Sequence, residues 1–112
     1  MDIIDLEEAL ERVQDDRELL KELMEDFVKD YLSKRKILNK AIEQKNFELI
    51  KDTAHFIKGA AGNISAKTIY TCLVIVEQLA DNQQIDLVVE LLIDVDKQFA
   101  ELQAYVSRFK IK

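Results

Sequence analysis

The 112-residue sequence contains no proline, no tryptophan, one cysteine, one histidine and only two glycines. Turns in β-sheet proteins draw heavily on proline and glycine, so their scarcity argues against an all-β domain. A single cysteine excludes an intrachain disulfide and is typical of an intracellular protein. A single histidine excludes any site that needs two.

The chain also lacks the features of secreted and membrane proteins. Its first residues are acidic and do not have the charged start and apolar core of a signal peptide. The most apolar run, residues 85–95, is interrupted by three acidic residues and is too short to span a bilayer. The length is that of one domain, so we expect residues 1–112 to form a single soluble, cytoplasmic domain.

Charge is distributed unevenly along the chain. The net charge of -6 argues against nucleic-acid binding, which requires a basic surface. Residues 34–67 nevertheless hold eight basic and three acidic residues, a net charge of +5, and they include His55. A local positive field on an acidic protein favours an acidic partner or a phosphate group.

Apolar residues recur at steps of three and four, which predicts helices throughout the chain. We expect a short helix over residues 4–12 and a long second helix that is opened by a capping box of Asp15 and Glu18. A third helix should run from the N-cap Asn46 to about Asn63, and a fourth should cover residues 66–80 with Ser65 as N-cap. After a polar turn at 81–84, we expect a fifth helix from about 86 to 109, whose apolar stripe begins at Leu87. Four long amphipathic helices with short connections predict an all-α fold, an antiparallel up-down four-helix bundle with a short additional N-terminal helix across one end.

The third helix carries the histidine on its polar face. On a helical wheel Lys51, Lys58, Gly59 and Gly62 all fall within ~60° of His55, while the aliphatic residues fall on the opposite side. Each glycine inside a helix costs roughly 0.8–1 kcal/mol relative to alanine. We expect the glycines to clear the surface around an exposed imidazole, so that another macromolecule can approach it beside the positive charge of Lys58.

The segment from His55 to Ala66, HFIKGAAGNISA, resembles the signature of histidine-containing phosphotransfer (HPt) domains, in which His-x-x-Lys-Gly is followed by small residues. The resemblance includes Ala54 and the spacing of Ile69, Cys72, Val76 and Glu77, and it covers essentially the whole chain. Ser65 stands where these domains usually have glycine, which bears on the local turn more than on the chemistry.

The resemblance implies that His55 accepts a phosphoryl group from the aspartyl phosphate of a receiver domain and passes it to another receiver. The site implied around it comprises Lys58, Lys51, Gly59, Gly62 and Phe56, which contact the phosphoryl group or the partner. Such a carrier has no kinase activity of its own and no cofactor, because the receiver brings the Mg²⁺. Partners would be response-regulator receivers and a hybrid sensor histidine kinase, with no nucleic acid or membrane involved.

Other interpretations stay open at this point. Asp52-x-x-His55 imitates half of a di-iron motif, but the second histidine is missing and no metal is expected. The chain could be a helical adaptor without phosphotransfer, or the phospho-accepting domain of a chemotaxis-like histidine kinase. Phe56 could anchor a partner or form the rim of the core, and Asp52 or Glu77 could orient the imidazole. Cys72 is expected in the core, and a monomer is expected because no leftover apolar stripe is evident.

Overall fold

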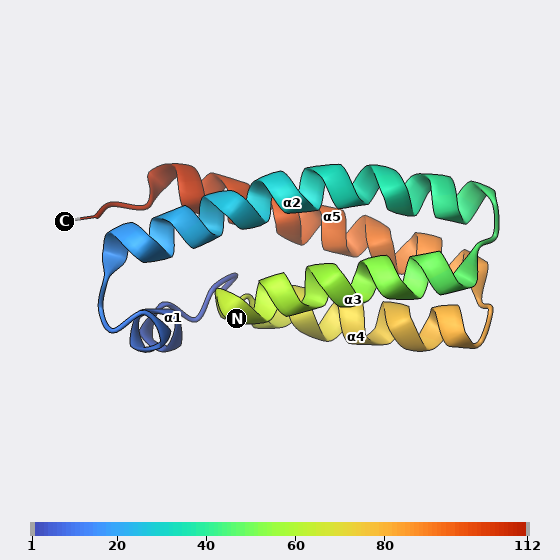
Figure 1. The fold of residues 1–112 in the computed structure, drawn as a ribbon, viewed down its shortest axis with the longest axis horizontal. Coiled ribbons are helices and arrows are strands. Elements are labelled where there is room, and N and C mark those ends of the chain that lie inside the picture. The colour runs from blue at the N-terminus through green and yellow to red at the C-terminus, as the bar shows by residue number, and fades with distance from the viewer. Residues whose placement is uncertain (1, 112) are drawn as a thin grey trace.

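A computed structural model describes residues 2–111, and within that range the secondary structure is entirely helical. The helices are α1 (Leu6–Arg12), α2 (Arg17–Glu43), α3 (Phe47–Asn63), α4 (Lys67–Asp81) and α5 (Ile85–Arg108). The four long helices run antiparallel in a rod of 45 × 20 × 20 Å, and α1 lies across one end (Figure 1). The predicted four-helix bundle with a short N-terminal helix is confirmed.

Each long helix packs against the helices that precede and follow it, and α5 closes the bundle against α2. The α3–α4 interface is the most extensive of the four, and the α2–α5 interface is the smallest. The core contains the apolar stripes of all four helices; among its largest buried side chains are Leu20, Met24, Phe27, Tyr31, Leu38, Ile50, Ile57, Ile69, Leu73, Leu92 and Leu102. Because α3 and α4 have the most extensive interface, they form a rigid support for residues on their shared surface.

Polar side chains open the first three helices. Asp5, Asp16 and Asn46 each accept a hydrogen bond from a backbone N–H three residues later, at 3.0–3.1 Å. The prediction for Asn46 is confirmed. The prediction that Asp15 caps α2 is wrong, because Asp15 lies in the preceding turn with φ 63° and Asp16 makes the cap.

Non-glycine residues form all four turns. Gln14, Lys45, Ser65 and Gln83 follow the ends of α1 to α4, and each has a φ between 51° and 56°. In every case the N–H of the next residue bonds to a carbonyl five residues before it, at 2.8–3.0 Å. This is the Schellman arrangement, in which glycine usually takes the left-handed position. Both glycines of this chain lie inside α3 instead, so the scarcity of glycine did not prevent tight turns.

The buried stripe of α5 differs from the prediction at its start. Val88 is buried, whereas the side chain of Leu87 is 46% exposed. Val88, Val95 and Leu102 are spaced by seven residues, so they lie on one line along the helix facing the core. Leu87 lies about 100° away from that line and points outward.

Candidate functional site

His55 lies midway along α3 and presents its ring to solvent. The side chain is 73% exposed, and Nδ1 lies 2.8 Å from Oε1 of Glu77 on α4. The two residues are 22 apart in sequence, and the antiparallel packing of α3 on α4 brings them to the same level of the bundle. The predicted exposure of His55 is confirmed, and Glu77 proves to be its direct partner.

Glu77 also binds the lysine of the motif. Nζ of Lys58 lies 2.9 Å from Oε2 of Glu77, so one carboxylate holds His55 with one oxygen and Lys58 with the other. The side chain of Lys58 is only 17% exposed and its Nζ lies 5.9 Å from the centroid of the Tyr70 ring. Lys58 lies on the His55 side of α3, as the helical wheel predicts, but it is held against α4 and does not extend freely into solvent.

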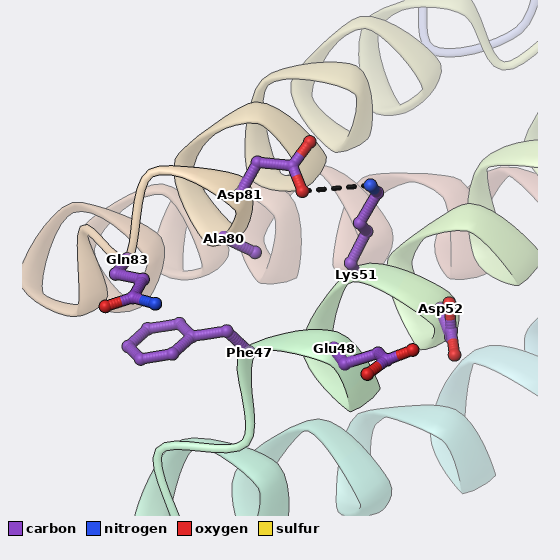
Figure 2. A pocket seen from close by; sticks show the side chains of 7 residues that line it. All are labelled: Phe47, Glu48, Lys51, Asp52, Ala80, Asp81 and Gln83. Carbon is purple, nitrogen blue, oxygen red and sulfur yellow. Dashed lines mark hydrogen bonds and ion pairs between the residues drawn. The ribbon is translucent and has the colours of Figure 1, made fainter.

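Lys51 makes a more open ion pair on the same side of α3. Its Nζ lies 2.9 Å from Oδ1 of Asp81, and the two side chains are 47% and 58% exposed. The hydrogen bond that Lys51 donates to Asp81 raises the pKa of Lys51. The pair borders a recess between the start of α3 and the end of α4, whose lining residues are Phe47, Glu48, Lys51, Asp52, Ala80, Asp81 and Gln83 (Figure 2). Asp52 lies in this lining, and the imidazole is hydrogen-bonded to Glu77 instead.

These contacts share one geometric rule. The pair His55–Glu77 spans 22 residues and the pair Lys51–Asp81 spans 30, and both are centred on Ala66 in the turn between α3 and α4. In an antiparallel helix pair, positions at equal distance from the turn lie side by side. That symmetry is the sequence signal from which Glu77 and Asp81 could have been identified as partners.

Nothing in the packing requires either glycine of α3. A Cβ added at Gly59 would meet no atom within 4 Å, and one added at Gly62 would meet the Tyr70 ring at 3.5 Å, an ordinary contact. Neither glycine has a positive φ. Alanine at Gly59 would favour the helix by roughly 0.8–1 kcal/mol. The reason for glycine at this position must therefore lie outside the contacts that residues 2–111 make with one another.

Phe56, the residue after His55, is exposed rather than part of the core rim. Its side chain is 47% exposed, and Nζ of Lys34 on α2 lies 4.4 Å from the ring centroid. A cation over the ring face is an attractive contact, and it leaves much of the ring accessible. The structure thus places an aromatic surface beside the imidazole, on the α2 side, opposite Glu77.

Ser65 adopts a left-handed backbone conformation of the kind that favours glycine. Its φ is 56°, and the residue is buried. The hydroxyl donates to Oε1 of Glu8 at 3.1 Å, and the carbonyl accepts from the N–H of Asp5 at 3.0 Å. The prediction that Ser65 caps α4 is wrong, since Ala66 is the N-cap and has no side-chain bond to the helix. Serine instead ties α1 to the end of the bundle.

Many basic side chains of residues 34–67 are already paired with carboxylates, so this segment has fewer unpaired positive charges than its net charge indicates. Arg35, Lys51 and Lys58 pair with Asp96, Asp81 and Glu77, and Lys67 pairs with Asp5 and Glu8 of the N-terminal region. Carboxylates from other parts of the chain thus neutralise half of the eight basic residues in segment 34–67.

Other kinds of site find no support in the described part of the chain. No three His, Cys, Asp or Glu side chains within residues 2–111 are grouped so as to hold a metal ion. Over the same range, no helix is both long and apolar enough to cross a membrane. Cys72 is partly buried among the residues that pack on the core, and its thiol is free.

Comparison with known proteins gives one match. The family model described as the Hpt domain matches residues 2–108, which is nearly the whole chain. Neither the curated proteins nor the solved structures contain a match.

Proposed function

Because the chain belongs to the Hpt domain family, whose members are phosphocarrier modules of two-component signalling, we propose that it is a phosphorelay intermediate. In this proposal His55 accepts a phosphoryl group from the aspartyl phosphate of one receiver domain and delivers it to the aspartate of another. The observation that carries the proposal is an exposed imidazole with only one of its two ring nitrogens bound, through Nδ1 to Glu77.

The contact with Glu77 supports the choice of one ring nitrogen as the reacting atom. A carboxylate at 2.8 Å favours the tautomer in which Nδ1 carries the proton, because an ionised carboxylate only accepts hydrogen bonds. Nε2 then holds the lone pair, and none of residues 2–111 makes a hydrogen bond to it. We therefore assign Nε2 as the phosphorylated atom.

Transfer to the histidine needs no proton to leave the site. The lone pair of Nε2 forms the N–P bond as the P–O bond to the aspartyl carboxylate breaks, and the electron pair of that bond stays on the receiver's carboxylate. The proton remains on Nδ1, where Glu77 stabilises the positive charge that develops on the ring. Such transfer depends mainly on positioning and electrostatics, and a ring fixed on a well-packed helix pair supplies the positioning. Transfer to the second receiver is the reverse of these steps.

The surface around His55 suits a folded partner. Gly59 lies one turn after His55 and leaves open space above the helix, and Phe56 offers an exposed ring on the other side. A receiver must bring its aspartyl phosphate within bonding distance of Nε2, so no side chain next to the imidazole can protrude into its path. The unexplained glycine meets that requirement.

The test is transfer from a labelled phospho-receiver to the purified chain. We expect an acid-labile, base-stable phosphoryl adduct on wild-type protein and none on His55→Gln, which should still fold and bind the receiver. The ATP-binding domain of a chemotaxis-type kinase serves as a second donor. Transfer from that kinase alone would support the alternative role as its phospho-accepting domain. Absence of transfer from every donor would leave a helical adaptor as the better interpretation.

A further inference from the structure

We propose that Lys51, rather than the motif residue Lys58, is the side chain that binds the phosphoryl group on His55, and that it leaves Asp81 to do so. This inference rests on the proposed function and adds a phosphorylation-dependent exchange of ion pairs to it. Both lysines lie on the α4 side of His55, so their different surroundings decide which one is available.

Lys58 already forms an ion pair within the site. Its Nζ holds Oε2 of Glu77 at 2.9 Å, and the two side chains are 17% and 15% exposed. Removing one partner of a poorly hydrated ion pair is costly, because the remaining charge is left uncompensated. If Lys58 moved to the phosphoryl group, Glu77 would lose the cation that balances it while it holds Nδ1 of His55. We therefore expect Lys58 to remain paired with Glu77 when His55 is phosphorylated.

Lys51 is free of that constraint. Its ion pair with Asp81 is exposed on both sides, and exposed ion pairs contribute little net stability. Lys51 precedes His55 by one helical turn, and residues four apart on a helix are neighbours on its surface. Its long side chain can thus reach the imidazole without any movement of the backbone.

Charge favours the exchange once His55 is phosphorylated. A phosphoryl group carries a charge of about -1.5 to -2 near neutral pH, against -1 for the carboxylate of Asp81. At equal distance the attraction for a lysine scales with that charge. Lys51 would then leave the recess of Figure 2, and the carboxylates of Asp81, Glu48 and Asp52 that line this recess would lose its positive charge. Phosphorylation would thereby make the recess next to the site more acidic.

The first experiment detects the exchange directly. His55 is phosphorylated with phosphoramidate, a small chemical donor, and the side-chain carboxyl ¹³C resonance of Asp81 is recorded before and after. We expect this resonance to shift in wild type and in Lys67→Gln, whose lysine pairs with Asp5 and Glu8 at the end of the bundle, and to stay in place in Lys51→Gln. An Asp81 resonance in wild type that does not respond to phosphorylation overturns the inference.

The second experiment measures the consequence for phosphotransfer. At equilibrium with a receiver, Lys51→Gln should lower the ratio of phosphorylated His55 to phospho-receiver by roughly two- to fivefold. Asp81→Asn, which releases Lys51, should raise it, and Lys67→Gln should leave it unchanged. Equal ratios in all four proteins would contradict the role of Lys51 while leaving phosphorylation of His55 intact. A wild-type chain that phosphoramidate modifies but no receiver does would refute the relay and not the exchange, whereas a chain modified by neither donor would refute both.

Discussion

The two sides of the bundle contain clusters built from the same kinds of group, a carboxylate, an aromatic ring and a cation, which differ in the exposure of the ring. On the α3–α4 side, Glu77 holds the ring of His55 and the cation of Lys58. On the α2–α5 side, Asp96 accepts a hydrogen bond from the hydroxyl of Tyr31 and pairs with both Nε and Nη2 of Arg35, at 2.9 and 3.1 Å. In each cluster a carboxylate on one helix joins an aromatic ring and a cation that lie about one turn apart on its neighbour.

What differs is where the ring lies. Tyr31 is 2% exposed and stacks on Phe99 with ring centroids 4.0 Å apart, whereas His55 is 73% exposed. The Asp96 cluster therefore fastens two helices whose shared interface is the smallest in the bundle. The Glu77 cluster joins two helices that are already closely packed, so its carboxylate can serve mainly to orient a reactive ring. One arrangement of groups thus stabilises the fold in one place and prepares chemistry in the other.

The largest effect expected from this comparison is that of Asp96→Ala on stability. The substitution leaves the Tyr31 hydroxyl and the Arg35 guanidinium without their shared acceptor, and we expect a loss of about 2–3 kcal/mol in the free energy of unfolding. Urea denaturation measures it, with the exposed Asp94→Ala on the same helix as control. Glu77→Ala should cost less, because it leaves only Lys58 without its partner, while the exposed ring of His55 can bind water instead. Equal losses at Asp96 and Glu77 would break the distinction between the two clusters.

Glu77→Gln should show the reverse pattern, with a large effect on rate and a small one on stability. Removing a carboxylate that orients a histidine costs roughly 10–100-fold in metal sites, and we expect the lower end of that range for phosphotransfer to His55. A smaller population of the Nδ1–H tautomer, measured by ¹⁵N NMR, should accompany the slower transfer. Glu90→Gln on the exposed face of α5 is the control. A slower rate with an unchanged tautomer population would show that Glu77 acts in some other way than by orienting the ring.

Tyr31→Phe tests the buried ring through pH. Burial, with a smaller contribution from the hydrogen bond to Asp96, raises the pKa of Tyr31 above its ordinary value near ~10. The folded protein therefore keeps a proton that the unfolded chain releases, so this stabilisation is complete below pH ~10 and is lost as the pH rises further. One such proton gives a slope of at most about 1.4 kcal/mol per pH unit.

Denaturation between pH 8 and 11 should reveal that slope as a difference between wild type and Tyr31→Phe. Lys51 and Lys67 also have raised pKa values, because carboxylates bind them, but their contributions are the same in both proteins. Tyr70→Phe, at an exposed position, should keep the wild-type slope. Identical alkaline slopes for all three proteins would show that ionisation of Tyr31 is not linked to unfolding.

The smallest effect expected is that of Gly59→Ala. Since a Cβ at this position meets no neighbour, the variant should gain roughly 0.8–1 kcal/mol of stability from helix propensity alone. Its affinity for a receiver should nevertheless fall, because the added methyl group lies where the partner approaches His55. Calorimetric binding measures this, with Ala100→Gly on α5 as a control that changes propensity far from the site. Unchanged affinity would mean that the surface near His55 need not be as low as we propose.

Local periodicity was sufficient for part of the structure. The position of His55 on an exposed helix face and the four-helix architecture depend on the spacing of apolar residues, and the N-cap at Asn46 depends on residue type. A single sequence displays both. The partial burial of Lys58 could not be predicted in this way, because a helical wheel describes one helix alone and α4 covers that side of α3. Ser65 was misassigned because it matches the usual N-cap residue types, although its backbone conformation is set by the end of the preceding helix.

The role of Glu77 also depends on a contact between two helices, which a single sequence does not show. Its spacing agreed with the family pattern, but its role required knowing which helix faces which. Once the turn at Ser65 and Ala66 is located, the symmetric positions on α3 and α4 follow directly. The contacts that the sequence did not predict were thus those between helices. The position of the turn between α3 and α4 is what determines which residues of the two helices face each other.

The C-terminal end of the described chain extends past the end of the rod where α1 packs, and the N-terminal residues lie beside the turn between α3 and α4 at that end (Figure 1). His55 lies midway along α3. A domain joined to either end by a linker would therefore be tethered near that end of the rod and away from His55. A flexible tether raises the effective concentration of the joined domain, by an amount that depends on whether its length matches the distance to be spanned. The same rod can therefore act between separate partners or beside a linked one, and only the linker has to change.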